Sequence, residues 1–201
     1  MRLIGVTGGV GAGKSQVLSY IREHYKCKIY LADEVAHLVK KKGEDCYFAL
    51  VDLLGKDILA EDGEINKSAM ASKIFADDDL LERVNAIVHP QVRIYLENRV
   101  NEARESADTE IVFIEAALLI EAGYKEFVDE LWYIYADVEV RKNRLMQSRG
   151  YSEEKISQIM EAQLSEEAFR KECDFVINNS GTLADSYRQI RRKLREYTWV
   201  D

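Results

Sequence analysis

The stretch of sequence that decides the fold is Gly8-Gly9-Val10-Gly11-Ala12-Gly13-Lys14-Ser15, which fits the pattern G-x-x-x-x-G-K-[ST] at every fixed position. The apolar segment Leu3–Thr7 before it is typical of a strand, and Val17, Leu18 and Ile21 after it have the spacing of a buried helix face. A loop of backbone N–H groups that leads into a helix offers donors and a favourable dipole to polyphosphate. The order strand, glycine-rich loop and helix therefore predicts a site for nucleotide phosphates.

The loop supplies a run of candidate nucleotide-binding residues: Gly11, Ala12, Gly13, Lys14, Ser15 and Gln16. Lys14 provides a mobile cation for the β- and γ-phosphates, and the Ser15 hydroxyl suits a Mg²⁺ ion that arrives with ATP. The motif alone leaves the reaction open. A GTPase switch is disfavoured, because the only Asn-Lys pair, Asn66-Lys67, is not followed by the aspartate of the guanine-reading pattern N-K-x-D.

Five short segments rich in β-branched or aromatic residues alternate with helical patterns. This alternation predicts an α/β fold with a mostly parallel sheet of five strands and helices on both faces. The predicted strands are Leu3–Thr7, Lys28–Leu31, Glu110–Ile114, Leu131–Tyr135 and Phe175–Ile177.

Two intervals break the alternation. The first, Glu34–Arg104, is charged and helical in pattern and too long for one crossover, so we interpret it as an inserted helical subdomain with a turn at Glu61-Asp62-Gly63. The second, Val138–Glu172, is either a pair of surface helices or a mobile lid. The last segment, Leu183–Tyr197, has apolar residues three and four apart and is expected to pack on the sheet.

The composition is that of a globular protein: 201 residues, 47% of them hydrophobic and 32% charged. The apolar runs are too short to span a bilayer, so we expect no membrane partner. A net charge of −8 disfavours nucleic acid as a partner, since affinity for it comes mostly from phosphate neutralisation. The sequence has no C-x-x-C pair among its three cysteines, Cys27, Cys46 and Cys173, so we expect reduced thiols. Because the first residues enter a strand pattern at once, we also expect a cytoplasmic location.

Two carboxylates follow predicted strands at the edge where ligands bind in an open parallel sheet. Asp33, after Lys28–Leu31, can accept a proton from an attacking hydroxyl or hold a water on Mg²⁺; the alternative is an N-cap of a helix Glu34–Lys42. Glu115, after Glu110–Ile114, is a candidate Mg²⁺ group in the place of a Walker-B acid, or equally a structural cap.

Basic side chains gather in the second helical interval: Arg141, Arg144, Arg149 and, further on, Arg170. Guanidinium groups can stabilise the charge that develops in phosphoryl transfer, although such a run is more often a solvated face. His89-Pro90 precedes a resumed helical pattern, so Pro90 is expected in the first turn of a helix with His89 just outside it.

Taken in order, these segments resemble the dephospho-CoA kinase family over essentially the whole chain. Its phosphate loop, its D-A-D-x-x-A segment and its L-L-x-E segment have counterparts in Val6–Ser15, Leu31–His37 and Leu118–Glu121. The helical substrate region and the C-terminal part are matched by Ile74-Phe75-Ala76, Ile87-Val88-His89-Pro90, Gln163 and Asp174–Gly181. This sequence has Leu31, Gln16, Ala117, Glu115 and Lys67 where the family more often has Asp, Thr, Pro, Asp and Arg.

The resemblance implies a P-loop kinase that uses ATP and Mg²⁺ to phosphorylate the ribose 3′-hydroxyl of dephospho-CoA, giving ADP and CoA, the last step of coenzyme A synthesis. It implies that Asp33 is the general base or orients the hydroxyl, and that Lys14 and Arg144 stabilise the transferring phosphoryl group. Further implied roles are an ATP contact at Arg149, a place near the adenine of ATP for Asn179, acceptor contacts at Phe75, His89 and Leu118, and Mg²⁺ at Ser15 and Glu115.

The expected organisation is a nucleotide-binding core of residues 1–33, 105–137 and 173–201, an acceptor (CoA) domain of residues 34–104 and a lid of residues 138–172, in a monomer or a small homo-oligomer. Two alternatives stay open at this point. One is a kinase of the same core that acts on another small acceptor, such as a nucleoside monophosphate. The other is a nucleotide-binding regulator without turnover, which the retention of Asp33, Lys14 and Ser15 disfavours.

Overall fold

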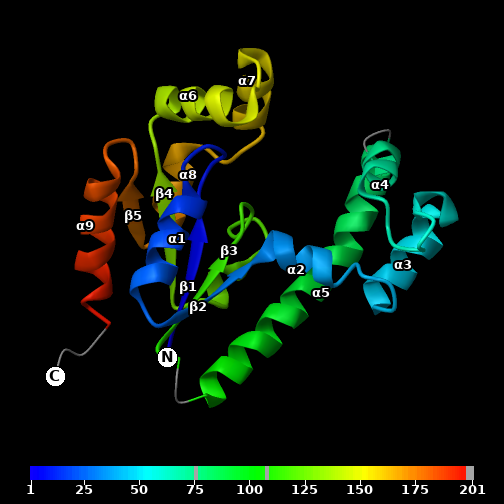
Figure 1. Ribbon diagram of the computed structural model, residues 1–201, viewed down its shortest axis with the longest axis horizontal. Coiled ribbons are helices and arrows are strands. Elements are labelled where there is room, and N and C mark those ends of the chain that lie inside the picture. Colours follow the sequence, from blue (N-terminus) through cyan, green and yellow to red (C-terminus); the bar gives the residue numbers. More distant parts are fainter. Residues whose placement is uncertain (75–76, 107–108, 198–201) are drawn as a thin grey trace. The chain divides into compact units, whose positions relative to one another are not determined.

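The computed structural model describes residues 1–74, 77–106 and 109–197, and for Asp78 only the backbone. Its centre is a five-stranded parallel sheet with the strand order β2-β3-β1-β4-β5 (Figure 1). The predicted α/β fold is confirmed, and each predicted strand end lies within one residue of the observed one, the usual uncertainty of such boundaries. The strands are β1 (Arg2–Thr7), β2 (Cys27–Leu31), β3 (Ile111–Glu115), β4 (Glu130–Tyr135) and β5 (Phe175–Asn178).

The middle of the sheet is apolar on both faces. β1 lies between β3 and β4, with Ile4 opposite Phe113 on one face and Leu3 opposite Val112 on the other. These four side chains are completely buried. Continuous apolar strands of this kind are expected where helices cover both faces of a parallel sheet.

Neighbouring residues of β4 show which helices cover which face, because side chains alternate along a strand. The Trp132 ring packs edge-on against Phe175, and Lys193, which belongs to the last helix, lies 5.5 Å above the Phe175 ring. Tyr133 points the other way and stacks on Phe169 at 4.6 Å between ring centroids. The last helix and the helix of Phe169 therefore lie on opposite faces of the sheet.

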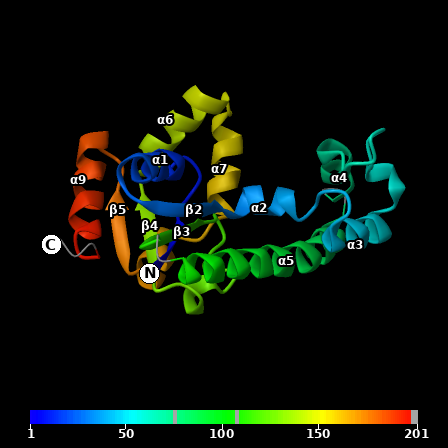
Figure 2. The same cartoon turned by 60° about the horizontal axis from the view of Figure 1, so that its bottom comes forward.

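The helices that accompany the sheet are α1 (Lys14–His24), α6 (Val138–Arg149), α7 (Glu153–Glu161), α8 (Glu166–Glu172) and α9 (Leu183–Leu194), with a short 3₁₀ turn η2 (Tyr124–Glu126). In both views α9 lies beside β5 (Figures 1 and 2). Its predicted apolar face is confirmed by the buried Ile190 and Leu194 and by Tyr187, which stacks on Tyr20 of α1 at 3.8 Å. A capping box of Thr182 and Asp185 begins the helix.

The chain divides into two compact units, one formed by Met1–Ile29 with the residues from Ala103 onward, and one formed by Tyr30–Glu102. The second unit contains α2 (Ala32–Leu38), α3 (Asp45–Leu54), the 3₁₀ turn η1 (Lys56–Ile58), α4 (Lys67–Ile74) and nearly all of α5 (Asp78–Glu105). The predicted turn at Glu61-Asp62-Gly63 is present, closed by a bridge between Leu59 and Ile65.

The helix after β2 begins earlier than expected. Asp33 is not the N-cap of a helix Glu34–Lys42 but the second residue of α2, whose N-cap is the extended Leu31. Ala32 favours the helical conformation, and Asp33 and Glu34 in the first turn complement the positive end of the helix dipole. The carboxylate of Asp33 is therefore exposed on the first turn of α2 and not tied to a cap.

The expectation that Pro90 begins a helix is wrong, because α5 runs unbroken through it. Proline removes the N–H that would bond to the carbonyl of residue 86, and Ala86 is exposed, so water can satisfy that carbonyl. A buried stripe with four-residue spacing holds the helix on both sides of the proline: Val84, Val88, Val92, Leu96 and Val100.

Candidate active site

The phosphate loop joins β1 to α1 in the order that the sequence predicts. Gly11 and Gly13 have left-handed backbone conformations, with φ of 76° and 92°, which glycine adopts without strain. Gly13 is the N-cap of α1, with no side-chain cap and no acidic residue in the first turn of the helix. The positive end of the α1 dipole is thus uncompensated by the chain's own groups, which suits an anionic ligand.

Lys14 folds back over this loop. Its Nζ donates a 2.7 Å hydrogen bond to the Gly8 carbonyl and lies 3.7 Å from the Glu115 carboxylate at the end of β3. The Lys14 and Glu115 side chains are only 16% and 15% exposed. The structure therefore brings together the predicted cation and one of the two predicted carboxylates at the mouth of the loop.

Arg141 and Gln163 hold the first half of the loop. The Arg141 guanidinium donates to the Val10 carbonyl at 2.8 Å and to Oε1 of Gln163 at 2.9 Å, and the same Oε1 accepts from the Val10 N–H at 3.1 Å. Burial lowers the pKa of Arg141. A Cβ on Gly9 would lie 2.4 Å from the guanidinium, so any other residue here would displace the Arg141 side chain from the loop. Arg141 thus braces the loop backbone, a role that its place in a charge run did not reveal.

Arg144 and Asn179 hold the second half. Arg144 donates from Nη1 to the Ala12 carbonyl at 3.3 Å and from Nη2 to the Asn179 carbonyl at 2.8 Å. The completely buried Asn179 side chain donates to the same Ala12 carbonyl at 2.8 Å and accepts from the Ser186 hydroxyl at 2.7 Å. Arg144, one of the basic residues of the second helical interval, and Asn179, which only the family resemblance singled out, therefore meet at the loop, from α6 and from the residue after β5.

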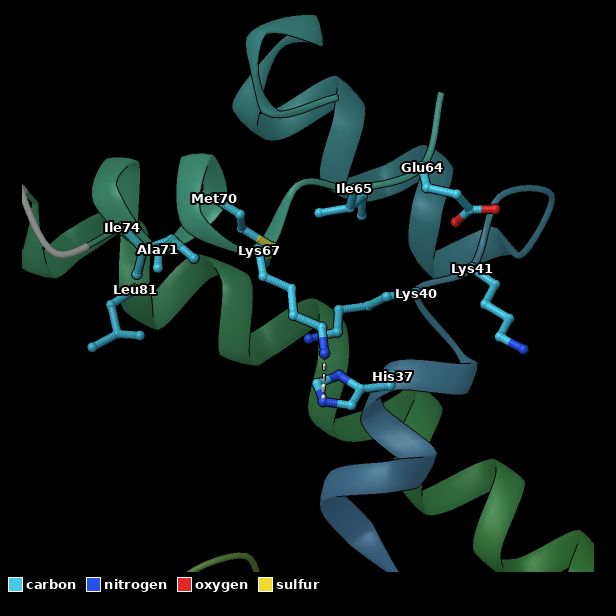
Figure 3. Close-up of a pocket in the computed structure, with 10 residues that line it drawn as sticks. All are labelled: His37, Lys40, Lys41, Glu64, Ile65, Lys67, Met70, Ala71, Ile74 and Leu81. Atoms are coloured by element: carbon cyan, nitrogen blue, oxygen red, sulfur yellow. Dashed lines mark hydrogen bonds between the residues drawn. The ribbon is translucent and has the colours of Figure 1, made fainter. Parts of the chain in front are cut away.

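The helical unit carries a cavity of about 480 Å³ between α2, α4 and α5. Figure 3 shows its lining: Ala71, Ile74 and Leu81 lie together at one end, and Lys41 and Glu64 lie at the other. The remaining lining residues are His37, Lys40, Ile65, Lys67 and Met70. No sequence pattern predicted this cavity, because its walls are far apart along the chain.

One polar contact crosses the cavity. Lys67 Nζ lies 3.3 Å from His37 Nε2, a contact that Figure 3 marks with a dashed line. Burial, together with the charges of Lys67 and Lys40, lowers the pKa of His37 against the opposing influence of Asp33 and Glu34. Burial also lowers the pKa of Lys40.

Comparison with known proteins decides the family. The model of the dephospho-CoA kinase family matches residues 2–185. The chain belongs to the dephospho-CoA kinase family. A dephospho-CoA kinase of Geobacter sulfurreducens is 38% identical over 190 residues, which are 94% of this chain and 95% of that one. One of Aquifex aeolicus is 35% identical over 198 residues, 98% of each chain.

Solved structures agree with the fold of a dephospho-CoA kinase. A Thermus thermophilus protein superposes with a TM-score of 0.82 at 29% identity, over 98% of both chains. The dephospho-CoA kinase of Campylobacter jejuni gives a TM-score of 0.73 at 20% identity over 98% of this chain and 97% of that one. Shikimate kinase of Acinetobacter baumannii, at 14% identity and a TM-score of 0.54 over 99% of this chain and 96% of that one, shares the P-loop kinase fold.

The other predicted site residues of this kinase that belong to the sheet unit are exposed. Ser15 and Gln16 are exposed in the first turn of α1, and Leu118, in the turn after β3, is 50% exposed. Arg149 ends α6 with its guanidinium 5.8 Å from the Tyr151 ring centroid.

Two predicted acceptor contacts, at positions 75 and 89, fall within the sequence range of the helical unit. His89 is exposed on α5, one residue before Pro90. Phe75 lies outside the described residues, so its predicted contact stays a prediction.

Across residues 1–74, 77–106 and 109–197, no helix is long and apolar enough to cross a membrane.

Proposed function

We propose that this enzyme transfers the γ-phosphoryl group of ATP to the ribose 3′-hydroxyl of dephospho-CoA, giving CoA and ADP. The observation that carries the proposal is the phosphate loop with Lys14 over its mouth, in a chain whose residues 2–185 match the model of the dephospho-CoA kinase family. ATP binds with its phosphates along the loop and against the amino end of α1. The acceptor binds to the helical unit.

Lys14 and Arg144 are the cations proposed to act on the transferring phosphoryl group. The bond from Lys14 to the Gly8 carbonyl is one that a phosphate oxygen can replace, since a charge-assisted bond to phosphate is the stronger of the two. Arg144, held at the Ala12 and Asn179 carbonyls, has a fixed direction and is half-buried. Preorganised charges of this kind stabilise the negative charge that develops on the phosphoryl oxygens.

Asp33 is proposed to orient the 3′-hydroxyl and to take its proton. An exposed carboxylate in the first turn of α2 is accessible to a ligand and does not spend its oxygens on a cap. Orientation and proton transfer are what a carboxylate can supply when the nucleophile is an alcohol. His89 and Leu118 are proposed to contact the acceptor from α5 and from the turn after β3.

The groups proposed to hold Mg²⁺ are the Ser15 hydroxyl and the Glu115 carboxylate. Oxygen donors fit this ion, which usually keeps several waters and uses one or two carboxylates together with substrate phosphates. Within the part of the chain that the structure describes, no three His, Cys, Asp or Glu residues gather as a metal site, in keeping with such a sparse protein contribution. When bound, the ion neutralises phosphate charge; Glu115 also holds Lys14 at the loop.

Asn179 is proposed to act on ATP through the loop and not as a direct contact to adenine. Both ends of its side-chain amide are engaged inside the protein, at Ala12 and Ser186. Arg149, at the exposed end of α6, is proposed to reach ATP when residues 138–172 act as a lid. A cytoplasmic enzyme, as a monomer or a small homo-oligomer, is part of the same proposal; the three cysteines are free thiols.

Asp33→Asn tests the role of the carboxylate. We expect turnover with dephospho-CoA to fall by about 10²–10⁴-fold, while the dissociation constant for ATP stays within about twofold. The matched control is Glu34→Gln, which makes the same charge change at the neighbouring exposed residue of the same turn and should keep full activity. Full activity in Asp33→Asn would remove Asp33 from the mechanism.

A further inference from the structure

The start of α2 places two ligand-binding groups one turn apart. Asp33 and His37 are four residues apart on this helix, so their Cβ atoms lie about 5–6 Å from each other on the same face. The charge of Asp33 is among those that act on the His37 ring. Lys40 follows two residues after the end of α2, and His37 and Lys40 both line the cavity of Figure 3.

The cavity has two walls of different chemistry. We call His37, Lys40 and Lys67 the cationic wall; they come from α2, the segment after it and the start of α4. The apolar wall comes from α4 with residues on either side of it, and it consists of Ile65, Met70, Ala71, Ile74 and Leu81. Lys41 and Glu64, which carry opposite charges, lie together at the far end (Figure 3).

This order of groups matches the order of groups along dephospho-CoA. The ligand presents a ribose with a 3′-hydroxyl, then a 5′-diphosphate, then a long uncharged pantetheine arm. The 3′-hydroxyl and the 5′-phosphate lie on opposite sides of one ribose, a separation of about one helical turn, ~5 Å. A hydroxyl at Asp33 therefore puts the diphosphate at His37, one turn along α2.

Resting on the function proposed above, we propose that the cationic wall binds the diphosphate of dephospho-CoA, that the apolar wall receives the pantetheine arm, and that His37 takes up a proton as the diphosphate binds.

The proton uptake follows from the contact between His37 and Lys67. An ammonium group has only donors, so Lys67 can bond to Nε2 of His37 only when that nitrogen is unprotonated. The contact with Lys67, with Lys40 nearby, thus favours neutral His37, in line with its lowered pKa. A diphosphate attracts Lys67 and leaves Nε2 beside negative oxygens, where the protonated ring becomes a second donor.

The sign of the pH dependence is fixed by this exchange. Because the ligand raises the pKa of His37, binding is tightest below the pKa of the free pocket and weakens as the pH rises toward the pKa of the occupied pocket. Between these two values the affinity falls by at most about tenfold per pH unit. Asp33 and Glu34 act on the ring in the opposite sense to Lys67 and Lys40, and Lys41 and Glu64 offset each other at the far end.

The test is isothermal titration of the full-length protein with dephospho-CoA, with Mg-ADP saturating the phosphate loop so that no reaction occurs. Titrations at pH 7.5 in buffers of different ionisation enthalpy report the protons taken up. We expect roughly half to one proton per ligand in the wild type. In His37→Gln, whose amide oxygen can still accept from Lys67, uptake should vanish and the affinity should lose its pH dependence. His24→Gln, in the other unit, is the control and should keep the uptake.

Two further variants test the walls. Lys67→Met should weaken dephospho-CoA binding by about 10- to 100-fold and leave ADP binding unchanged. Leu81→Ser should weaken it by about fivefold and leave proton uptake in place. Binding without proton uptake, or uptake that persists in His37→Gln, overturns the inference and leaves the proposed function standing. Failure of dephospho-CoA to bind at all instead overturns the proposed function.

Discussion

Removal of the Asn179 side chain should lower the free energy of unfolding, because this side chain ties the phosphate loop to α9. Asn179→Ala deletes two buried hydrogen bonds, to the Ala12 carbonyl at 2.8 Å and from the Ser186 hydroxyl at 2.7 Å. Each contributes about 1 kcal/mol net. The partners are not left bare, because Ala12 keeps a 3.3 Å bond from Arg144 and Ser186 keeps a 3.4 Å contact with the Asn178 carbonyl. The expected loss is therefore about 2–3 kcal/mol.

Urea unfolding followed by tryptophan fluorescence measures this loss as a lower transition midpoint at an unchanged slope. For a chain of this size the matching drop in Tm is roughly 5–10 °C. The KM for ATP should rise several-fold, since the Ala12 carbonyl is no longer fixed. The matched control is Asn178→Ala, an exposed neighbour whose side chain makes one local bond to the Ser180 N–H at 2.9 Å, with an expected loss of about 0.5 kcal/mol. Equal stability in the two variants would show that the buried bonds of Asn179 do not stabilise the fold.

Three further predictions concern other parts of the core. In Gly8→Ala, the new Cβ would lie 2.4 Å from the backbone oxygen of Ile134 at a φ of +151°, so we expect the free energy of unfolding to fall by about 3 kcal/mol and ATP binding to be lost. The control is Gly123→Ala, where the Cβ meets open space and the free energy of unfolding should fall by only about 1 kcal/mol; thermal unfolding measures both. Lys14→Ala should raise the dissociation constant for Mg-ATP and lower kcat by at least about 10²-fold; unchanged values of both would exclude its role. Burial opposes the ionisation of Glu130, but hydrogen bonds from Tyr197, Arg2 and Trp132 outweigh it and lower its pKa to about 2. This carboxylate should then account for about 3 kcal/mol of the unfolding free energy that the wild type loses as the pH falls from about 5 to 2, so Glu130→Gln should lose about 3 kcal/mol less over the same range.

The sheet and the phosphate loop could be predicted from the sequence because their signals are local. A strand such as Leu3–Thr7 shows its apolar residues in one short run, and the loop needs glycines at fixed offsets from Lys14. The start of α2 and the path of α5 through Pro90 were predicted wrongly. In both places a local preference of the sequence competes with the packing or electrostatics of the folded helix. At Pro90 a buried apolar stripe on both sides of the proline outweighs its lost hydrogen bond.

The contacts around the loop could not be predicted, because they join residues that are far apart in the chain. Arg141 and Gln163 meet Val10 across more than a hundred residues, and nothing in their own neighbourhood separates them from a solvated charge run. The same holds for the cavity of the helical unit, where His37 and Lys67 are 30 residues apart. Sequence spacing identifies groups on one helix or in one loop, whereas a site between elements requires the fold.

The proposed kinase activity is tested most directly by measuring ADP formation from Mg-ATP with dephospho-CoA, AMP or CMP as acceptor, with the product examined by ³¹P NMR. We predict ADP formation that depends on dephospho-CoA, with a new phosphomonoester on the ribose 3′-oxygen and the stoichiometric appearance of CoA. Turnover with AMP or CMP and none with dephospho-CoA would contradict it. So would tight binding of ATP with no ADP produced from any acceptor, which is the behaviour of a nucleotide-binding regulator.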